Sequence, residues 1–360
     1  HQDIPAYLMR VNAGKYEEAL EVILRRNPLP FITGTICSHR CQDKCMRNAY
    51  DESVYIRQQK LKAAEGGFDK LLPKLRPGSP LPGRKVAVVG GGPAGMAAAF
   101  FLGRAGVDVT VFERKDALGG IVRHVIPAFR ISGQAIDNDE KLLRAMGVRV
   151  MLTTEVKDIH NLFTLGYSHV ILATGAWQKG SAGLEYGQET NVIEFLEAAK
   201  KAPDTLNLGR HVVVIGGGNT AMDAARAALR AGAKSSTLVY RRTKKYMPAD
   251  AEELEMAIAD GVEFLELVAP VEQKDGKLIC EKMKLGDPDD KGRRKPVPTG
   301  EMVEIPCDTV VSAVGEKVES EVFTRNGITV DEKGIPAFKT NLEGVYAGGD
   351  AMRGPATVVE

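Results

Sequence analysis

The chain has 360 residues, 44% of them hydrophobic and 26% charged, a composition typical of a soluble globular protein with two or three domains. Its 48 basic and 47 acidic residues are interspersed, which argues against a nucleic-acid partner, and its apolar runs are far shorter than a membrane span. The odd number of cysteines, five, favours a reducing cytoplasm over a secreted disulfide scaffold, and the isolated Cys280 and Cys307 are expected to be inert.

The first seventy or so residues predict helices. Apolar residues recur at helical spacing in a run that is closed by Asn27 and Pro28, and a second helical run, "VYIRQQKLKAAEGGFDKLL", follows. Residues 73–83 contain four prolines and two glycines, so they predict an extended linker and a domain boundary near residue 80. There is no signal peptide and no initial methionine, and we expect the chain to be a piece of a longer polypeptide.

Between the two helical runs lies "GTICSHRCQDKCMRN", in which Cys37, Cys41 and Cys45 are spaced four apart. Zinc prefers four ligands, commonly with a Cys-x2-Cys pair, and fits this spacing poorly. A disulfide would leave one thiol over and belongs to another compartment. An iron-sulfur cluster needs several thiolates and can take one from a distant group. Three free thiols are the remaining alternative.

After the linker, a pattern of strand, glycine turn, helix and strand occurs twice. "RKVAVVGGGPAGMAAAFFLGRAGVDVTVFER" and "RHVVVIGGGNTAMDAARAALRAGAKSSTLVYRR" are similar over about thirty residues, so each predicts one βαβ nucleotide-binding unit. Residues 127–156 predict a helix and a strand between them. Residues 262–311 predict a β ribbon with a turn at "GDPDDKGRR".

The first copy carries a complete dinucleotide fingerprint. Gly90 allows the tight turn, Gly92 lets the backbone approach a pyrophosphate, and Gly95 lets the helix pack on the strand. The helix N-terminus then faces the negative charge. Glu113, eighteen residues after Gly95, is placed to accept hydrogen bonds from a ribose. The alternative is a glycine turn without a ligand.

The second copy has Gly216, Gly218 and Ala221, but its second strand ends in "LVYRR" instead of "VFER". Aligned on the strand ends, Arg241 takes the place of Glu113, and Arg242 follows. Two cations without a carboxylate suit a ribose 2′-phosphate, which predicts NADP(H) rather than NAD(H). A solvated strand end is the alternative.

Several further segments carry a family resemblance that covers essentially the whole chain. "LGGIVRHVIPAFRI", "YRRTKKYMPADAEELEMAIADGVEFLEL" and "GVYAGGDAMRGPATVVE" resemble segments of flavoproteins similar to the glutamate synthase small subunit and the N-terminal half of dihydropyrimidine dehydrogenase. "VILATGA" and "VVSAVGE" resemble the two hinge strands of that family. "HQDIPAYL" and "NPLPFITGTIC" look most similar to the iron-sulfur subunits of selenate reductases. One departure is His124-Val125, where the family usually has Tyr-Gly.

The resemblance implies an α/β fold in which two Rossmann-like domains are nested, as in glutathione and thioredoxin reductases, behind a small all-α iron-sulfur-type domain. The implied domains are 1–78 (helical), 84–177 and 316–360 (FAD) and 178–315 (NADPH). The residues assigned to FAD are Gly90, Gly92, Pro93, Ala94, Gly95, Glu113, Arg114, Gly119, Gly120, Arg123, Ile126, Ala173, Thr174, Gly175, Gly349, Asp350, Ala356 and Thr357, with a helix beginning near Ala356. Those assigned to NADPH are Gly216, Gly218, Asn219, Thr220, Ala221, Arg241, Arg242, Ala313 and Gly315.

By the same resemblance, Cys37, Cys41 and Cys45 are metal ligands belonging to two [4Fe-4S] clusters, with Cys37 and Cys41 on one and Cys45 on the other. The family's second cysteine group would precede His1, so we expect incomplete ligand sets and thiols without a cluster in this chain. Gln58 or Gln59 is a candidate further ligand.

The sequence therefore predicts a cytoplasmic flavoprotein that takes hydride from NADPH onto FAD and passes electrons to [4Fe-4S] clusters and a partner or fused reductase or synthase. No catalytic side chain is assigned, because hydride passes between cofactors. No Cys-x-x-Cys pair lies between the hinge strands, so a dithiol acceptor is not expected. A self-contained NADPH diaphorase and a non-catalytic assembly subunit are the alternatives.

Overall fold

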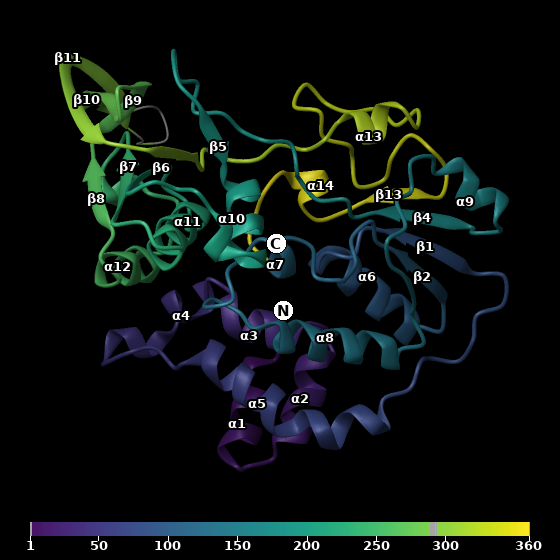
Figure 1. The fold of residues 1–360 in the computed structure, drawn as a ribbon. Helices are drawn as coiled ribbons and strands as arrows, with labels where there is room; N and C mark the ends of the chain where they lie inside the picture. The colour runs from purple at the N-terminus through teal and green to yellow at the C-terminus, as the bar shows by residue number, and fades with distance from the viewer. Residues whose placement is uncertain (1, 289–291, 293, 360) are drawn as a thin grey trace. The chain divides into compact units, whose positions relative to one another are not determined.

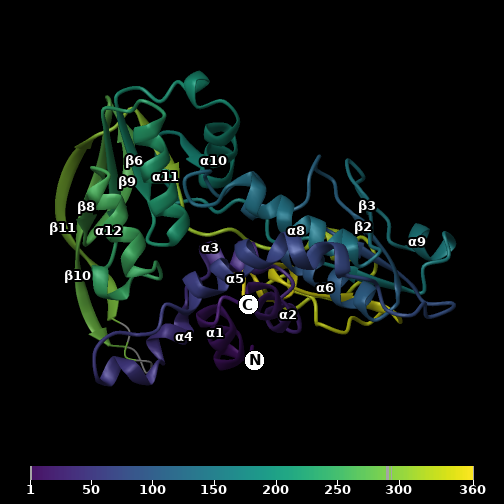
Figure 2. The same cartoon turned by 90° about the horizontal axis from the view of Figure 1, so that it is seen from below.

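The computed structural model describes residues 2–288, 292 and 294–359, and they form two compact units. The first unit comprises residues 1–124, 128–177 and 317–360, and the second comprises 125–127 and 178–316. Figures 1 and 2 show the elements of each from two directions. The chain thus enters the second unit after Trp177 and leaves it after Glu316.

The N-terminal part of the first unit is helical, as predicted. It contains α1 (Ile4–Asn12), α2 (Tyr16–Leu24), α3 (Pro30–Ile36), α4 (Arg40–Asp43), η1 (Met46–Ala49), α5 (Ile56–Leu71) and η2 (Leu72–Lys74). A Cβ on Gly67 would lie 2.5 Å from the Tyr16 carbonyl oxygen, so the two glycines of "EGGF" let α5 approach α2 closely. The helices enclose a core of Tyr7, Ile23 and Ala63.

The rest of the first unit is built on a parallel sheet with the strand order β13-β4-β1-β2-β3. Its strands are β1 (Lys85–Val89), β2 (Asp108–Phe112), β3 (Arg149–Met151), β4 (His169–Leu172) and β13 (Val345–Ala347). The helices of this part are α6 (Pro93–Arg104), α7 (Ile121–His124), α8 (Gly133–Ala145), α9 (His160–Thr164), α13 (Glu321–Thr324) and α14 (Asp350–Arg353). This confirms the first βαβ unit and the helix and strand that follow it.

A buried carboxylate joins the helical segment to the sheet segment. Asp139 on α8 is fully buried, and its two oxygens accept hydrogen bonds from the backbone N–H groups of Phe31 (3.1 Å) and Ile32 (2.8 Å). These groups lie in the first turn of α3, where helical N–H groups have no partner within the helix. Leu29, the residue before α3, has an apolar side chain, which cannot accept hydrogen bonds from these N–H groups. Burial raises the pKa of Asp139 well above its ordinary value, against the opposing effect of the two N–H groups.

The second unit repeats the same architecture in the strand order β5-β12-β6-β7-β8, again all parallel. Its strands are β5 (Glu189–Asn191), β6 (His211–Ile215), β7 (Ser235–Tyr240), β8 (Glu263–Glu266) and β12 (Thr309–Ser312). Its helices are α10 (Val192–Lys201), η3 (Pro203–Thr205), α11 (Asn219–Arg230), η4 (Lys244–Tyr246) and α12 (Ala251–Ala259). This confirms the second βαβ unit.

The ribbon predicted for residues 262–311 is only partly correct. An antiparallel sheet consists of β9 (Val268–Lys274), β10 (Lys277–Pro288) and β11 (Arg294–Pro306). The two ends of the predicted ribbon are instead β8 and β12, which pair in parallel with β7 and β6. A short apolar strand has the same local pattern in either sheet, so its partner is decided by packing. Residues 289–291 and 293 of the predicted turn at "GDPDDKGRR" lie outside the described residues.

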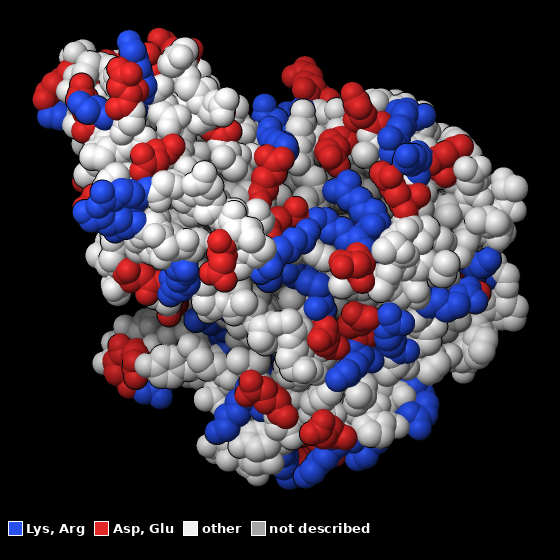
Figure 3. All heavy atoms as spheres, viewed as in Figure 1, with Lys and Arg blue, Asp and Glu red and all other residues white. Residues whose placement is uncertain are grey.

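The distribution of charged side chains and the length and apolar character of the helices can be compared with what the composition predicted. Figure 3 shows Lys and Arg interspersed with Asp and Glu over the face in view. Within the described residues, no helix combines the length and the apolar character that crossing a bilayer requires.

Asp139→Ala should loosen α3, because it leaves two buried N–H groups without a partner. An unsatisfied buried donor costs about 1–3 kcal/mol, so we expect amide hydrogen exchange across residues 30–36 to accelerate about 10- to 100-fold. Gln134→Ala is the matched control, since Gln134 is exposed on the same helix and its amide donates only to Asn138. Equal exchange rates in the two variants would contradict the capping role.

Candidate functional site: two glycine-lined strand junctions and a cysteine segment

The first fingerprint lies where β1 and β4 end side by side. A Cβ on Gly90 would clash with the Ala173 carbonyl oxygen, and one on Gly95 would clash with the Gly90 carbonyl oxygen. These two positions therefore accept only glycine. Gly92 differs, because a Cβ there would come no closer to the protein than 3.9 Å. The open space beside Gly92, at the N-terminus of α6, fits the approach of a pyrophosphate.

Glu113 follows β2 and turns back to the glycine loop. Its side chain is 7% exposed, and one carboxylate oxygen accepts a hydrogen bond from the Gly91 N–H (2.6 Å) while the other accepts from the Lys115 N–H (2.8 Å). A carboxylate oxygen has more than one lone pair, so each can accept a further hydrogen bond. A fixed acceptor at this strand end is what ribose hydroxyls require.

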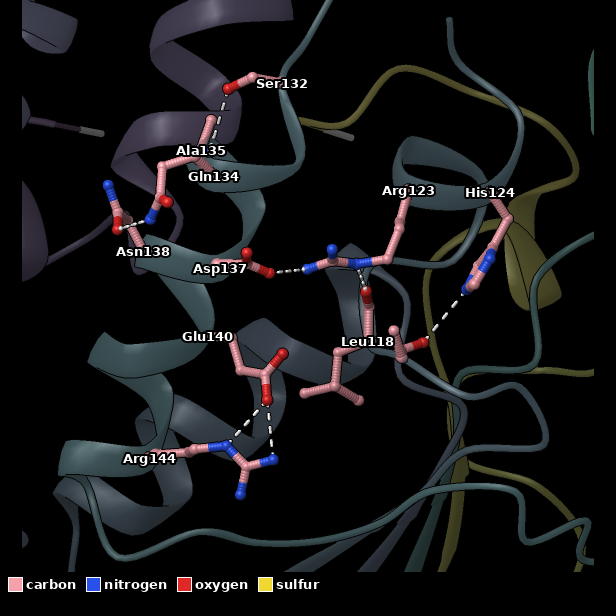
Figure 4. Close-up of polar contacts among 11 residues, drawn as sticks. Leu118, Arg123, His124, Ser132, Gln134, Ala135, Asp137, Asn138, Glu140 and Arg144 are labelled. Carbon is pink, nitrogen blue, oxygen red and sulfur yellow. Dashed lines mark hydrogen bonds and ion pairs between the residues drawn. The ribbon is translucent and has the colours of Figure 1, made fainter. Parts of the chain in front are cut away.

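The segment that resembles a flavin-flanking stretch also reaches this loop. The Gly119 N–H donates to the Gly91 carbonyl (2.8 Å), and a Cβ on Gly120 would lie 2.9 Å from the Gly92 Cα. The guanidinium of Arg123 is engaged by protein groups. It donates hydrogen bonds to the Leu118 carbonyl and to Asp137 on α8 (2.6 Å), as Figure 4 shows. Arg123 therefore links this segment to α8.

His124 is the departure from the family pattern. Its ring nitrogen Nε2 lies 3.2 Å from the Ala117 carbonyl oxygen (Figure 4). Burial lowers the pKa of His124, which favours the neutral imidazole. His124 therefore ties its own loop together.

The closing motif packs on the same loop. A Cβ on Gly349, whose φ is +64°, would lie 2.5 Å from the Ala94 Cβ, so this glycine brings Asp350 to the start of α6. The helix predicted from Ala356 is wrong: residues 356–359 form no helix, and α14 ends at Arg353. Gly354 has φ +77° and Pro355 has no N–H, so the helical hydrogen bonds of α14 stop there.

Two of the residues assigned to FAD have other partners, and two lie beyond α14. Arg114 lies 3.8 Å from Glu319 and stacks over the Trp177 ring at 5.2 Å. Ile126 falls in the second unit, where its carbonyl accepts a hydrogen bond from Lys200. Ala356 and Thr357 lie in the segment beyond α14. The remaining FAD assignments lie on the loop 90–95 itself or at residues 113, 119–123, 173–175 and 349–350.

The second fingerprint repeats the strand junction at β6 and β12. A Cβ on Gly216 would clash with the Ala313 carbonyl oxygen, just as Gly90 would with Ala173. Gly218 corresponds to Gly92, and a Cβ there would meet no protein atom within 4 Å. A Cβ on Gly180 would clash with the Gly315 carbonyl oxygen, so the two connecting segments also touch. Thr220 and Ala221 lie in the first turn of α11.

The pairing of the strands corrects the alignment of Arg241 with Glu113. Val89 pairs with Phe112, whereas the matching residue Ile215 pairs with Val239. Tyr240 therefore takes the place of Glu113, and its ring packs against Gly217. The alignment was one residue off because β2 ends at Phe112, which pairs with Val89, whereas β7 continues for one residue beyond Val239, which pairs with Ile215. Arg241 is exposed one residue later, and Arg242 is half-buried, with no hydrogen-bond partner at Nε among the described residues.

The loop of residues 241–250, which carries these arginines, is hydrogen-bonded to the start of α11. The Asn219 amide donates to the Asp250 carboxylate (3.1 Å), and the Asp250 N–H donates back to the Asn219 side chain (2.9 Å). The Tyr240 hydroxyl donates to the Tyr246 carbonyl (2.8 Å). Residues 241–250 are thus tied to Tyr240 through Tyr246 and to the start of α11 through Asp250.

The cysteines of the N-terminal segment fall into two environments. Cys37, 6% exposed, caps α3, and its sulfur lies 3.7 Å from the Lys60 ammonium. The charge of Cys37 acts on Cys41, whose pKa is raised first by burial and then by that charge. Tyr7 lies near both, and burial followed by the two sulfurs raises its pKa. Cys45 stands apart, and the backbone N–H groups of Val54 and Arg47 lower its pKa.

Among the described residues, no group of three or more His, Cys, Asp and Glu side chains is arranged to hold a metal. The division of the three sulfurs between two clusters stays a prediction. Gln58 is exposed and Gln59 half-buried, whereas Lys60 contacts Cys37.

The two isolated cysteines are buried and close enough to interact. Burial raises the pKa of Cys280 to about 12, with a further contribution from Cys307, and burial raises the pKa of Cys307 to about 12 as well. Both are protonated at neutral pH, which agrees with the prediction that they are inert.

Two important residues escaped the sequence reasoning although a signal was present. Asp139 occupies the apolar stripe of α8 between Ile136 and Leu142, and Lys60 occupies that of α5 between Ile56 and Ala63. A charged residue at a core position of an amphipathic helix is rarely buried without a partner, so the pattern itself indicates that Asp139 and Lys60 each contact a polar group.

Two parallel sheets, each with a glycine junction between adjacent strand ends, and a cysteine-bearing helical segment define a dinucleotide-dependent oxidoreductase. Residues 84–360 match the family described as pyridine nucleotide-disulphide oxidoreductase, and residues 1–66 match the 4Fe-4S domain II of dihydropyrimidine dehydrogenase. The chain belongs to the pyridine nucleotide-disulphide oxidoreductase family, and the predicted likeness to glutamate synthase small chains is confirmed by the relatives below. The predictions of FAD, NADPH and a [4Fe-4S] group agree with these families.

The glutamate synthase [NADPH] small chain of Escherichia coli (strain K12) is 33% identical over 100% of this chain and 83% of its own length. The protein YgfK of the same organism is 42% identical over 99% of this chain and 36% of its own length. The NADP(+)-dependent formate dehydrogenase subunit beta of Moorella thermoacetica is 36% identical over 100% of this chain and 56% of its own length. The chain therefore spans about a third to three fifths of several such relatives.

The fold also matches a solved structure, Mycobacterium tuberculosis FprA in complex with NADPH. The TM-score is 0.63 at 22% identity, covering 77% of this chain and 80% of that one. This likeness supports the predicted nested α/β fold.

Gly218→Ala should leave the fold unchanged, because its φ of −94° suits any residue and the added methyl meets no protein atom. A nucleotide approaching the backbone there would meet that methyl, and overpacking costs about 1–3 kcal/mol. We expect the Kd for NADPH to rise about 10- to 100-fold at an unchanged Tm. Unchanged affinity would show that no nucleotide approaches at Gly218.

Proposed function

We propose that the chain is an electron-input module that takes hydride from NADPH onto FAD and passes electrons through [4Fe-4S] clusters to a partner or fused reductase or synthase. The observation that carries this proposal is the difference between its two equivalent glycine junctions. One has the buried carboxylate of Glu113 at the neighbouring strand end, and the other has Tyr240 followed by Arg241 and Arg242. The first suits free ribose hydroxyls, and the second suits a 2′-phosphate.

When bound, the two nucleotides supply the redox chemistry, hydride transfer from nicotinamide to flavin. The chain's own residues bind and orient. Gly92 and Gly218 leave room for phosphate oxygens at the N-termini of α6 and α11, and the Glu113 carboxylate is placed to accept hydrogen bonds from ribose hydroxyls. Arg123 and Asp137 hold the segment 118–123 in place. No side chain is required to donate or accept a proton.

The cysteines support onward transfer rather than a closed diaphorase. Cys280 and Cys307 are buried with raised pKa values, so neither is suited to exchange with a disulfide substrate. Cys37, Cys41 and Cys45 lie on the segment that matches a 4Fe-4S domain, so we propose them as ligands that are completed by further thiolates. We propose a cytoplasmic location, where such thiols stay reduced.

The partner is proposed from the relatives. A glutamate synthase small chain and a formate dehydrogenase beta subunit are by name parts of larger enzymes, so a catalytic subunit or domain is the expected electron acceptor. The sequence and the fold carry no feature that selects glutamate, formate or selenate.

Replacing both Arg241 and Arg242 by Ala should remove the preference for NADPH. Charge-assisted hydrogen bonds contribute about 1.5–3 kcal/mol each, so we expect the rate of anaerobic flavin bleaching with subsaturating NADPH to fall at least about tenfold, while the rate with NADH changes little. Lys234→Ala, an exposed cation at the opposite end of β7, serves as the control. An equal fall with both nucleotides would contradict the assignment.

Replacing Cys37 or Cys45 by Ser should separate the two halves of the reaction. Bleaching of the flavin by NADPH should remain within about twofold of the wild type, because the cysteines do not hold either nucleotide. Iron content and electron delivery to the partner should fall, since losing a ligand typically costs most of the cluster affinity. Undiminished turnover with a physiological small acceptor, together with unchanged iron content, would favour the diaphorase. A purified wild-type protein without flavin would favour an assembly subunit.

A further inference from the structure

Lys60 is a buried cation, and a buried ammonium needs a negative charge close to it. Its side chain is 5% exposed and lies in the apolar stripe of α5, between Ile56 and Ala63. Within the described part of the chain, no carboxylate lies within ion-pair distance of its ammonium, and its hydrogen-bond partner is the Cys37 sulfur at 3.7 Å. A buried ammonium costs several kcal/mol unless an opposite charge compensates it.

A protonated thiol compensates such a charge poorly, whereas a metal-bound thiolate carries negative charge. Cys37 is held for this contact by a second residue of the same helix face, because the Arg57 guanidinium donates to the Cys37 carbonyl (3.1 Å). Cys41 lies close enough for its charge to act on Lys60 as well. The Cys37 sulfur therefore lies within hydrogen-bond distance of the buried cation, and the exposed Cys41 acts on it through its charge.

We propose that Lys60 is a positioning residue of the iron-sulfur site at Cys37 and Cys41, and that its ammonium, by donating to the Cys37 sulfur, raises the reduction potential of the cluster held there. This inference rests on the proposed function. Reduction adds negative charge to the cluster, so a fixed positive charge on a ligand sulfur stabilises the reduced form more than the oxidised form. The same charge helps to keep Cys37 in its ligating orientation.

The test compares Lys60→Met with Lys62→Met in the cluster-loaded, anaerobically purified protein. Lys62 lies two residues further along α5, is exposed, and contacts only the Tyr16 ring, so it is a matched control for charge and helix. Midpoint potentials are measured by EPR-monitored redox titration. Lys60→Met should make the reduced cluster about tenfold less populated at a given potential, a shift of about 59 mV for one electron, and Lys62→Met should not.

A second readout uses the metal-free chain. Met fills a similar space without charge, so Lys60→Met should keep or raise the Tm of the metal-free protein, which a purely structural role for Lys60 would not allow. If Lys60→Met does not load iron, Lys60→Gln keeps a donor without the charge. Failure of both to load at an unchanged metal-free Tm would support the positioning role, and a collapsed Tm in both would overturn it.

The two proposals can fail separately. A loaded Lys60→Met variant with a wild-type potential would overturn the role of Lys60 and leave the proposed function intact. Wild-type protein that contains no iron when isolated as the whole polypeptide would overturn the iron-sulfur part of the proposed function and this inference with it.

Discussion

The structure depends on one repeated constraint, the contact of two neighbouring parallel strands through their backbones at a glycine. Gly90 meets the Ala173 carbonyl in the first sheet, and Gly216 meets the Ala313 carbonyl in the second. In both sheets the crossovers leave on opposite sides of this junction, since β1 lies between β4 and β2, and β6 lies between β12 and β7. A crevice forms at such a switch point at the carboxyl ends of the strands. Most of the other residues assigned to the nucleotides lie on segments near one of these two junctions, whereas Arg114 and Ile126 have other partners and Ala356 and Thr357 lie beyond α14.

Helix α8 links the first crevice to the cysteine segment. Asp137 and Asp139 are two residues apart, so they face nearly opposite sides of the helix. Asp137 holds Arg123 of the segment beside the glycine loop (Figure 4), and Asp139 caps α3, which ends at Cys37. Burying Asp139 is costly, but removing it would strand two buried N–H groups. One helix therefore holds both the segment beside the first glycine loop and the helix that ends at Cys37, within a single compact unit.

The sequence was most informative where the chemistry is local. The two glycine patterns were found at once because only glycine tolerates these backbone contacts, and the buried cysteines were recognised as isolated. The position of Arg241 was predicted one residue away, since strand pairing is set by hydrogen bonds between Gly216 and Val239 that the local pattern does not encode. Gln58 and Gln59 were candidates because the resembled family places a Gln or Glu on this helix. The side of α5 that faces Cys37 is decided by its packing against α2 and α3, which the local pattern does not encode, and Lys60 lies on that side.

The spacing of the three cysteines acquires a physical meaning from the backbone between them. In an unbroken helix, residues four apart would place all three sulfurs along one face. Instead α3 ends at Cys37, His39 adopts a left-handed φ of +33°, and the four-residue α4 ends before Cys45. The chain thus turns Cys37 and Cys41 toward the buried Lys60, while Cys45 accepts backbone N–H groups elsewhere. A regular spacing is thus converted into two different environments, since the Cys37 sulfur lies beside a buried ammonium and Cys45 accepts hydrogen bonds from backbone N–H groups.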